Sequence, residues 1–232
     1  MRYGSLSISV IALALAACGA DVEEATAGDQ AQEQSVAPED IAVEGEERRI
    51  VAFGDSLFAG YNLAEHEGYP ERLERALRQQ GINARVVDAG VSGDTSAAGR
   101  QRLAFVLDQQ AEKPDLLLLE LGGNDMLRGI QPDQTRENFK AMLDELDKRE
   151  IPVLLMGMRA PPNYGPDYQR DFDALYGDLA REYGVPLVPF WLESIYQDPS
   201  LFQSDRIHPT AQGIDALVAD TIHEVQAALA TD

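Results

Sequence analysis

Short apolar runs alternate with longer amphipathic stretches along the chain from residue 50 to its end. The runs are continuously apolar instead of alternating with polar residues, which is typical of parallel strands covered on both faces of a sheet. Five such runs predict strands, at residues 50–53, 84–88, 115–121, 153–157 and 185–189.

The stretches between these runs have the spacing of helices. Leu73 and Leu77 lie four residues apart, and Gly81 is placed to end that helix. Three later stretches repeat apolar residues at intervals of three and four, which predicts one apolar stripe along each helix. The stripes are Phe139, Met142, Leu143 and Leu146; Phe172, Leu175, Tyr176, Leu179 and Tyr183, followed by Gly184; and Ile214, Leu217, Val218, Ile222, Val225 and Leu229.

The alternation of strand and helix predicts the fold class. Five strands interleaved with helices indicate an α/β protein, built as a three-layer α/β/α sandwich around a mostly parallel five-stranded sheet. The length of 50–232 suits one domain, and this part of the chain contains no internal repeat.

The first 17 residues have a different pattern. Arg2 precedes a mostly apolar run from Leu6 to Ala17, which is too short to span a bilayer as a helix of the mature protein. Small residues then precede Cys18, the only cysteine, and this arrangement resembles a bacterial lipoprotein signal peptide. We expect cleavage before Cys18, lipidation of Cys18 and anchoring in the cell envelope of a Gram-negative-type bacterium, facing the periplasm. An ordinary secretory signal, giving a soluble periplasmic protein, is the alternative.

Residues 18–49 read as an acidic tether between this signal and the domain. They carry ten acids and no aromatic residue, a composition typical of a disordered segment. The whole chain has 40 acidic and 19 basic residues and a net charge of −21, which disfavours nucleic acids and anionic headgroups as partners. We expect a monomer that associates with membranes only through a lipidated Cys18.

A candidate nucleophile follows the first predicted strand, in the segment Gly54-Asp55-Ser56-Leu57. Parallel α/β sheets place their chemistry just beyond the carboxyl ends of the strands, where Ser56 is expected. The pattern alone is also ordinary turn composition. Its interpretation as a catalytic segment therefore depends on whether the chain supplies a base, a group that orients the base, and donors for an oxyanion.

Only three histidines can supply the base. His223 falls within the last amphipathic stretch and His66 in a charged loop, so both are expected at the surface. His208 lies in a loop before the last helix, with Pro209 predicted at the first helical position. Asp205 stands three residues earlier, close enough to hold the Nδ1–H tautomer of His208. A proline-started helix with incidental charges is the alternative.

Two donors follow other strands. Gly93 comes after the second strand, where the missing Cβ lets its backbone N–H approach a ligand. Asn124 comes after the third strand and carries a side-chain amide of the kind that stabilises oxyanions. Each is also compatible with a simple turn. All the candidate groups nevertheless fall at the carboxyl edge of the predicted sheet or in the loop before the last helix, and random placement would scatter them.

These segments, taken in order, resemble the conserved blocks of the GDSL, or SGNH, hydrolases, with Ser56, Gly93, Asn124 and His208 as the four lettered positions. The likeness extends over nearly all of 50–232 and is closest to the periplasmic multifunctional acyl-CoA thioesterase I/protease I/lysophospholipase group and its arylesterase relatives. The matching stretches are 54–57, 92–96, 120–125, 127–129, 163–165, 185–190 and 205–209.

The resemblance implies a flavodoxin-like sandwich that hydrolyses small acyl esters, lipids and thioesters without a metal or cofactor. It implies that Ser56 is the nucleophile, His208 the base and Asp205 its orienting carboxylate. The implied oxyanion hole consists of the backbone N–H groups of Ser56 and Gly93 and the side chain of Asn124. The implied substrate-binding residues are Leu57, Met126, Leu127, Pro162, Tyr164 and Ile207, with Met126 narrowing the acyl groove and Asp55, Asp94 and Asp125 shaping loops.

Other classes remain open. A flavin- or nucleotide-binding module suits a flavodoxin-like fold, but Gly54 to Gly60 has neither the Gly-x-Gly-x-x-Gly pattern nor the Lys-Ser/Thr of a P-loop. A nucleophile-elbow hydrolase needs glycine where Phe58 stands. A non-catalytic envelope lipoprotein would usually have lost one catalytic group, and none is missing. Aryl esters, lysophospholipids, acyl thioesters and sugar O-acetyl groups all fit the same chemistry.

Overall fold

The computed structural model describes residues 41–230, in which five parallel strands form one sheet. The strand order is β2-β1-β3-β4-β5, which is the flavodoxin-like order and confirms the predicted fold class. The chain reverses its direction of winding between β1 and β3, and ligands of such sheets bind in the crevice at this point. The strands are β1 (Arg48–Gly54), β2 (Ala84–Gly90), β3 (Leu116–Leu119), β4 (Val153–Met156) and β5 (Leu187–Val188).

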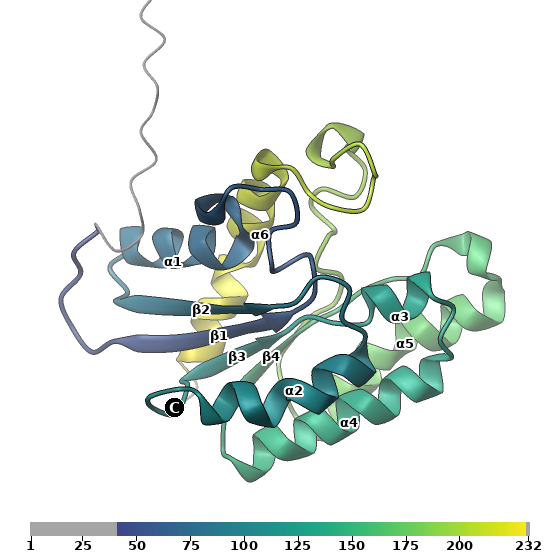
Figure 1. The fold of residues 1–232 in the computed structure, drawn as a ribbon, viewed down its shortest axis with the longest axis horizontal. Coiled ribbons are helices and arrows are strands. Elements are labelled where there is room, and N and C mark those ends of the chain that lie inside the picture. The colour runs from purple at the N-terminus through teal and green to yellow at the C-terminus, as the bar shows by residue number, and fades with distance from the viewer. Residues whose placement is uncertain (1–40, 231–232) are drawn as a thin grey trace, which may run out of the picture. The chain divides into compact units, whose positions relative to one another are not determined.

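Helices cover both faces of the sheet and complete three layers (Figure 1). Helices α1 (Tyr69–Gln79) and α6 (Ala211–Leu229) pack against each other on one face. Helices α2 (Ser96–Asp108), α4 (Pro132–Lys148) and α5 (Pro166–Tyr183) lie on the other face, with α4 between its neighbours. Short helical segments fill the connections: η2 (Glu65–Glu67), α3 (Gly123–Leu127), η3 (Pro162–Tyr164) and η4 (Pro199–Leu201).

The central strands form the core because apolar side chains leave them on both faces. Residues 50–53 of β1 and all of β3 are at most 1% exposed. The parallel register pairs Ile50 with Leu116 and Phe53 with Leu119, so both strands end at the same level. The residues that follow β1 and those that follow β3 therefore lie side by side.

The strand boundaries differ from the sequence prediction at several points. Strand β1 begins at Arg48, two residues early, because it already pairs with β2 there. Strand β2 is an edge strand and mostly half-exposed instead of fully buried. The predicted strand 185–189 is reduced to two residues, since Pro186 and Pro189 have no N–H to donate to the sheet.

Two helix predictions need correction. Pro209 was expected at the first position of the last helix, but Thr210 caps α6, its hydroxyl accepting from the Gly213 N–H, and Pro209 instead pairs with Phe202. Met126 and Leu127 belong to the short helix α3, which the sequence pattern did not predict. The sequence pattern also gave no apolar stripe for α2, which contains the buried Leu103 and the exposed Phe105.

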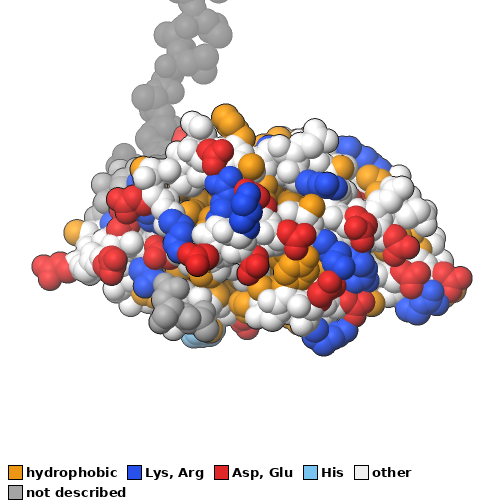
Figure 2. Space-filling view, turned by 90° about the horizontal axis from the view of Figure 1, so that it is seen from below, with side chains coloured by type: hydrophobic (Ala, Val, Ile, Leu, Met, Phe, Trp, Pro, Cys, Tyr) orange, Lys and Arg blue, Asp and Glu red, His pale blue; other side chains and the backbone are white. Residues whose placement is uncertain are grey.

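Opposite charges lie next to each other on the outer face of α2, α4 and α5 (Figure 2). Ion pairs join α4 to its neighbours on both sides, through Arg149 and Asp108, Arg136 and Asp178, and Lys140 and Glu182. These pairs are partly exposed to solvent, so each contributes about 0.2–1 kcal/mol.

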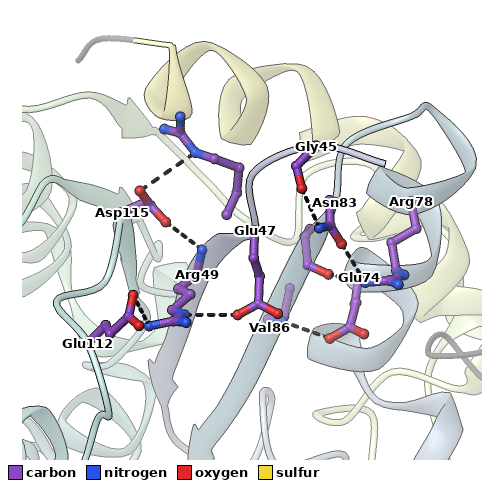
Figure 3. A network of polar contacts seen from close by, with 11 residues as sticks. Gly45, Glu47, Arg49, Glu74, Arg78, Asn83, Val86, Glu112 and Asp115 are labelled. Atoms are coloured by element: carbon purple, nitrogen blue, oxygen red, sulfur yellow. Dashed lines mark hydrogen bonds and ion pairs between the residues drawn. The ribbon is translucent and has the colours of Figure 1, made fainter. Parts of the chain in front are cut away.

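A second polar network closes the amino-terminal edge of the sheet (Figure 3). The Arg49 backbone N–H donates to Asp115 over 2.6 Å, and its guanidinium contacts Glu47 and Glu112 at 2.9 and 2.5 Å. The Asn83 amide donates to the carbonyl of Gly45 over 2.9 Å. The last residues before β1 are thereby attached to the domain.

The predicted signal peptide, Cys18 and most of the predicted tether lie outside the described residues. Within residues 41–230, no helix is both long enough and apolar enough to cross a membrane.

Candidate active site

A cavity of about 660 Å³ opens at the carboxyl edge of the sheet, beside the ends of the neighbouring strands β1 and β3. Ser56, Gly93, Asn124 and His208 all line it, so the structure brings the four predicted positions together. Most of its wall is apolar. The apolar lining residues are Leu57, Met126, Leu127, Met158, Pro161, Phe190, Leu192, Tyr196, Pro199, Phe202 and Ile207.

Ser56 is presented by a tight turn directly after β1. The buried carboxylate of Asp55 accepts the Leu57 N–H over 3.0 Å, and the Ala59 N–H donates to the Asp55 carbonyl over 3.0 Å. These bonds fix the backbone on both sides of the serine. Asp55 therefore shapes the loop, as the sequence analysis expected.

His208 connects Ser56 to Asp205. Its Nε2 lies 2.8 Å from the Ser56 Oγ, and its Nδ1 lies 2.7 Å from the Asp205 Oδ2. Because an ionised carboxylate only accepts hydrogen bonds, the Nδ1 carries the proton and the Nε2 is free to accept the serine hydroxyl. This is the geometry that a serine nucleophile needs in order to lose its proton.

The loop around Asp205 is folded by its own carboxylate. Its Oδ1 accepts the N–H groups of Ile207 and His208 at 2.9 and 3.0 Å, and Arg206 adopts a φ of 59° to turn the chain between them. Partial burial raises the pKa of Asp205, but these bonds and the one from the His208 ring outweigh it and lower the pKa to about 2. Asp205 thus stays ionised beside His208.

Gly93 is held with its N–H free. Its φ of 87° is a left-handed conformation that favours glycine, and its carbonyl accepts the Arg128 guanidinium over 2.7 Å. Among the described residues, neither the Gly93 N–H nor the Ser56 N–H donates to a protein acceptor. Both lie at the cavity and are available to a ligand.

Asn124 lies in the first turn of α3, where its side chain faces the end of β1. Its Nδ2 donates to the Asp55 Oδ2 over 2.9 Å. One amide hydrogen is used in this bond, which leaves the other for the cavity that Asn124 also lines.

The remaining predicted residues are divided. Leu57, Met126, Leu127 and Ile207 line the cavity. Pro162 and Tyr164 do not: they belong to η3, where the Tyr164 ring stacks on Tyr168 at 5.3 Å, and Pro161 lines the cavity instead. His66 and His223 are exposed and do not line it. Asp94 accepts from Arg102. Asp125, expected to shape a loop, lies in α3 and accepts from Ser96 and Thr135.

Two contacts of the His208 loop were missed by sequence reasoning. The Tyr61 ring packs on the His208 imidazole with 4.4 Å between ring centroids. The Gln203 amide donates to the carbonyls of Tyr61 and Pro209 at 2.8 and 2.9 Å, which joins the serine loop to the histidine loop. The one available signal was the position of Tyr61, five residues after the candidate nucleophile.

The described residues contain no group of three or more His, Cys, Asp or Glu that could hold a metal ion. What they assemble is a serine, a histidine and an aspartate in hydrogen-bonded sequence, with backbone and amide donors beside the serine. Fold and site together define a serine hydrolase arrangement on a flavodoxin-like sheet.

Comparison with known proteins identifies the family. The GDSL-like lipase/acylhydrolase family matches residues 52–216. Esterase TesA of Pseudomonas aeruginosa is 41% identical over 160 residues, which cover 69% of this chain and 79% of that protein. The thioesterase 1/protease 1/lysophospholipase L1 of Escherichia coli is also 41% identical over 160 residues, covering 69% of this chain and 74% of that one. The chain belongs to the GDSL-like lipase/acylhydrolase family.

Solved structures agree with this assignment. The esterase AlinE4, described as an SGNH-hydrolase family esterase, is 57% identical, covers 80% of this chain and 98% of its own, and superposes with a TM-score of 0.69. A crystal structure of TesA is 37% identical, covers 78% and 99% of the two chains, and gives a TM-score of 0.73.

Proposed function

We propose that this protein is a serine hydrolase that cleaves carboxylic esters and thioesters through an acyl-enzyme on Ser56. The observation that carries the proposal is the unbroken hydrogen-bonded series from Asp205 through His208 to Ser56, which ends at the wall of an apolar cavity. An acyl chain fits such a wall, because it gains by leaving water.

The first half of the reaction follows from these contacts. The Ser56 Oγ attacks the acyl carbon while His208 Nε2 takes the hydroxyl proton, and Asp205 stabilises the resulting imidazolium. Charge develops on the acyl oxygen, which the N–H groups of Ser56 and Gly93 and the Asn124 amide stabilise. His208 then returns the proton to the leaving alcohol or thiol, and the acyl group stays on Ser56.

The second half repeats the steps with water as the nucleophile. His208 takes a proton from the water molecule as its oxygen attacks the acyl carbon, and the same donors hold the oxyanion. Collapse of the intermediate releases the carboxylic acid, with the proton returning from His208 to the Ser56 Oγ. The carboxylic acid is released and the free enzyme is regenerated, and the reaction consumes only the ester and water.

The relatives support this choice of residues. Two solved forms of AlinE4 carry a serine-to-alanine and an aspartate-to-alanine substitution, and those positions are separated by as many residues as Ser56 and Asp205. The curated relatives are named as an esterase, as a thioesterase, protease and lysophospholipase, and as an arylesterase. We infer aryl esters, short to medium acyl esters and lysophospholipids as substrates.

A fluorophosphonate probe tests the nucleophile directly. We expect it to label the purified protein at Ser56 and to abolish hydrolysis of p-nitrophenyl esters. Ser56→Ala should lose both labelling and turnover, while Ser204→Ala, a substitution of an exposed serine beside Asp205, should keep both. Turnover that survives in Ser56→Ala would overturn the proposal.

A substrate series decides the acyl group. Hydrolysis of p-nitrophenyl esters of increasing chain length, measured beside a lysophospholipid and an O-acetylated sugar, separates the alternatives. Because the buried Met126 lines the cavity, we expect kcat/KM to decline for long chains and Met126→Gly to restore them. A marked preference for acetylated sugars would instead assign the protein as a carbohydrate O-acetyl esterase.

We further propose that the protein is a periplasm-facing lipoprotein anchored through Cys18, with residues 1–17 removed. The support is the apolar run that ends in small residues before the only cysteine. Expression with labelled palmitate should give a labelled membrane-bound protein, and Cys18→Ala should be unlabelled. Equal membrane association of both forms would contradict the anchor.

A further inference from the structure

A second acid lies beneath the nucleophile loop, and the proposed mechanism gives it no role. Glu120 follows β3 and is fully buried, and its backbone N–H donates to the Phe53 carbonyl over 2.9 Å. Its Oε2 accepts the backbone N–H of Asp55 over 3.2 Å. Its Oε1 is buried and has no hydrogen-bond partner among the described residues. Ionising a buried carboxyl group that accepts only one hydrogen bond is energetically costly, so its neutral form is favoured.

Asp55 is the neighbour that decides the charge. It is 1% exposed, and its backbone N–H bonds the Glu120 Oε2, so two buried acids adjoin each other. Two adjacent buried carboxylates do not both ionise. Asp55 accepts N–H groups from Leu57 and Asn124, whereas Glu120 accepts only one, so the charged form is better supported on Asp55.

The titration of the two groups agrees with this difference. Burial, and then the Asp55 charge, raise the pKa of Glu120 well above its ordinary value. Burial also raises the pKa of Asp55, but its bonds from Leu57 and Asn124 and the nearby His208 oppose that rise. Glu120 is therefore the member of the pair that favours the neutral form.

We propose that Glu120 is a positioning residue for the oxyanion hole, which as a neutral acid donates a hydrogen bond to the Asp55 carboxylate and thereby fixes Asp55 where it holds the Asn124 amide. The proposal rests on the proposed function, because Asn124 is an oxyanion donor only in that mechanism. Glu120 would hold the Asn124 amide in position through Asp55. The series runs Glu120, Asp55, Asn124, and ends at the position where the acyl oxygen becomes charged.

The groups around the pair do not supply another partner. The Tyr176 hydroxyl, on α5, donates to the Leu121 carbonyl over 2.7 Å, and Asp125, on α3, accepts from Ser96 and Thr135. His208 is the other charged group that acts on Asp55, and it lowers the pKa of Asp55. Loss of the Glu120 proton would leave two negative charges in contact, and the repulsion would move Asp55 away from Asn124.

Matched substitutions separate positioning from packing. Glu120→Gln keeps a neutral side chain with N–H donors, so kcat for p-nitrophenyl acetate should stay within about threefold of the wild type. Glu120→Met has similar length but cannot donate, so kcat should fall at least tenfold with KM nearly unchanged, as expected when a transition-state interaction is weakened. A Glu120→Met enzyme with wild-type kcat would overturn the proposal.

Infrared spectroscopy tests the neutral acid in the wild-type protein itself, and Glu120→Gln serves only to assign the band. At about pH 8 ordinary carboxyl groups are ionised, so the wild-type protein should show a protonated-carboxyl carbonyl band that is missing from Glu120→Gln. A wild-type protein without this band would overturn the proposal.

The fluorophosphonate probe keeps this failure distinct from failure of the proposed function. If labelling at Ser56 persists while Glu120→Met is fully active, only the positioning role is lost. If Ser56→Ala still turns over ester, the proposed function fails, whatever Glu120 does.

Discussion

The two edges of the sheet use polar residues in opposite ways. At the amino-terminal edge, Arg49 and its acidic neighbours bind one another, and the network attaches the incoming chain to β1 (Figure 3). At the carboxyl edge, Asp55 and Asp205 bind groups that are in turn directed at a cavity. The first network is satisfied by its own members, and the second ends at N–H donors that line the cavity and at the Ser56 hydroxyl.

The exposed apolar side chains are also distributed unequally between the two edges. Of the six large hydrophobic side chains that are exposed in the described part of the chain, four line the cavity. They are Tyr61, Leu127, Tyr196 and Ile207. Exposed apolar surface gathered at one place marks a binding site, so the carboxyl edge carries a cost in stability that the amino edge avoids. Substitutions at the two edges should therefore have different effects.

The largest effect is expected for Asp205→Asn. The amide no longer holds the Nδ1–H tautomer, so kcat should fall about 10³–10⁴-fold while the protein stays folded. Steady-state kinetics with p-nitrophenyl acetate, beside a circular dichroism spectrum, check both. A loss below tenfold would mean that another group orients His208.

A smaller loss is expected for Asn124→Ala. Removing one oxyanion donor costs about 10²–10³ in kcat, and KM should change little because the interaction forms in the transition state. The control is Asn138→Ala, which removes an amide on α4 that donates to the Ser96 hydroxyl on α2. Equal losses in the two variants would point to a general disturbance of α3 and α4.

Asp115→Asn should affect stability alone. The carboxylate accepts the Arg49 N–H over 2.6 Å, and weakening that bond should lower the free energy of unfolding by about 1 kcal/mol. Urea denaturation measures the change, and kcat should equal that of the wild type. A lowered kcat would show that the two edges are connected through β1 and β3.

The smallest effect concerns acid stability. The pKa of Asp205 is about 2 in the folded protein and about 3.9 in the unfolded chain. The ionised Asp205 therefore contributes its full stabilisation above the unfolded value, and this stabilisation is lost as the pH falls through about 2. The difference in urea midpoint between wild type and Asp205→Asn should be constant above about pH 5 and should shrink between about pH 4 and 2. A difference that stays constant to about pH 2 would contradict the lowered pKa.

The sequence predicted that Ser56 and Asn124 meet because parallel strands end at a common edge, and it placed His208 in the loop before the last helix. That rule predicts which residues lie close together, but it does not predict which of them form hydrogen bonds with each other. The bond between Asn124 and Asp55 spans 69 positions, and Glu120 looked like the continuation of a buried apolar strand. Whether its side chain turns toward Asp55 depends on the register of β1 against β3, which local pattern does not contain.

Helix α2 shows a second limit. Its buried positions include the small Ser96 and Gly99 beside Leu103, while Phe105 is 66% exposed. Large apolar residues therefore do not recur along α2 at a regular helical interval, although α2 packs against α4 as α5 does. The segment between β5 and α6 is similar, since Phe190, Tyr196 and Phe202 line the cavity but lie outside the helices and strands.

The span between Ser56 and His208 is 152 positions, and Gln203 joins their two loops shortly before the last helix. Chains are synthesised from the amino terminus, so Ser56 is made 152 positions ahead of His208. A nascent chain that already holds all five strands still has a serine without its base. The proposed hydrolysis therefore cannot begin before the loop that carries His208 has reached the serine loop.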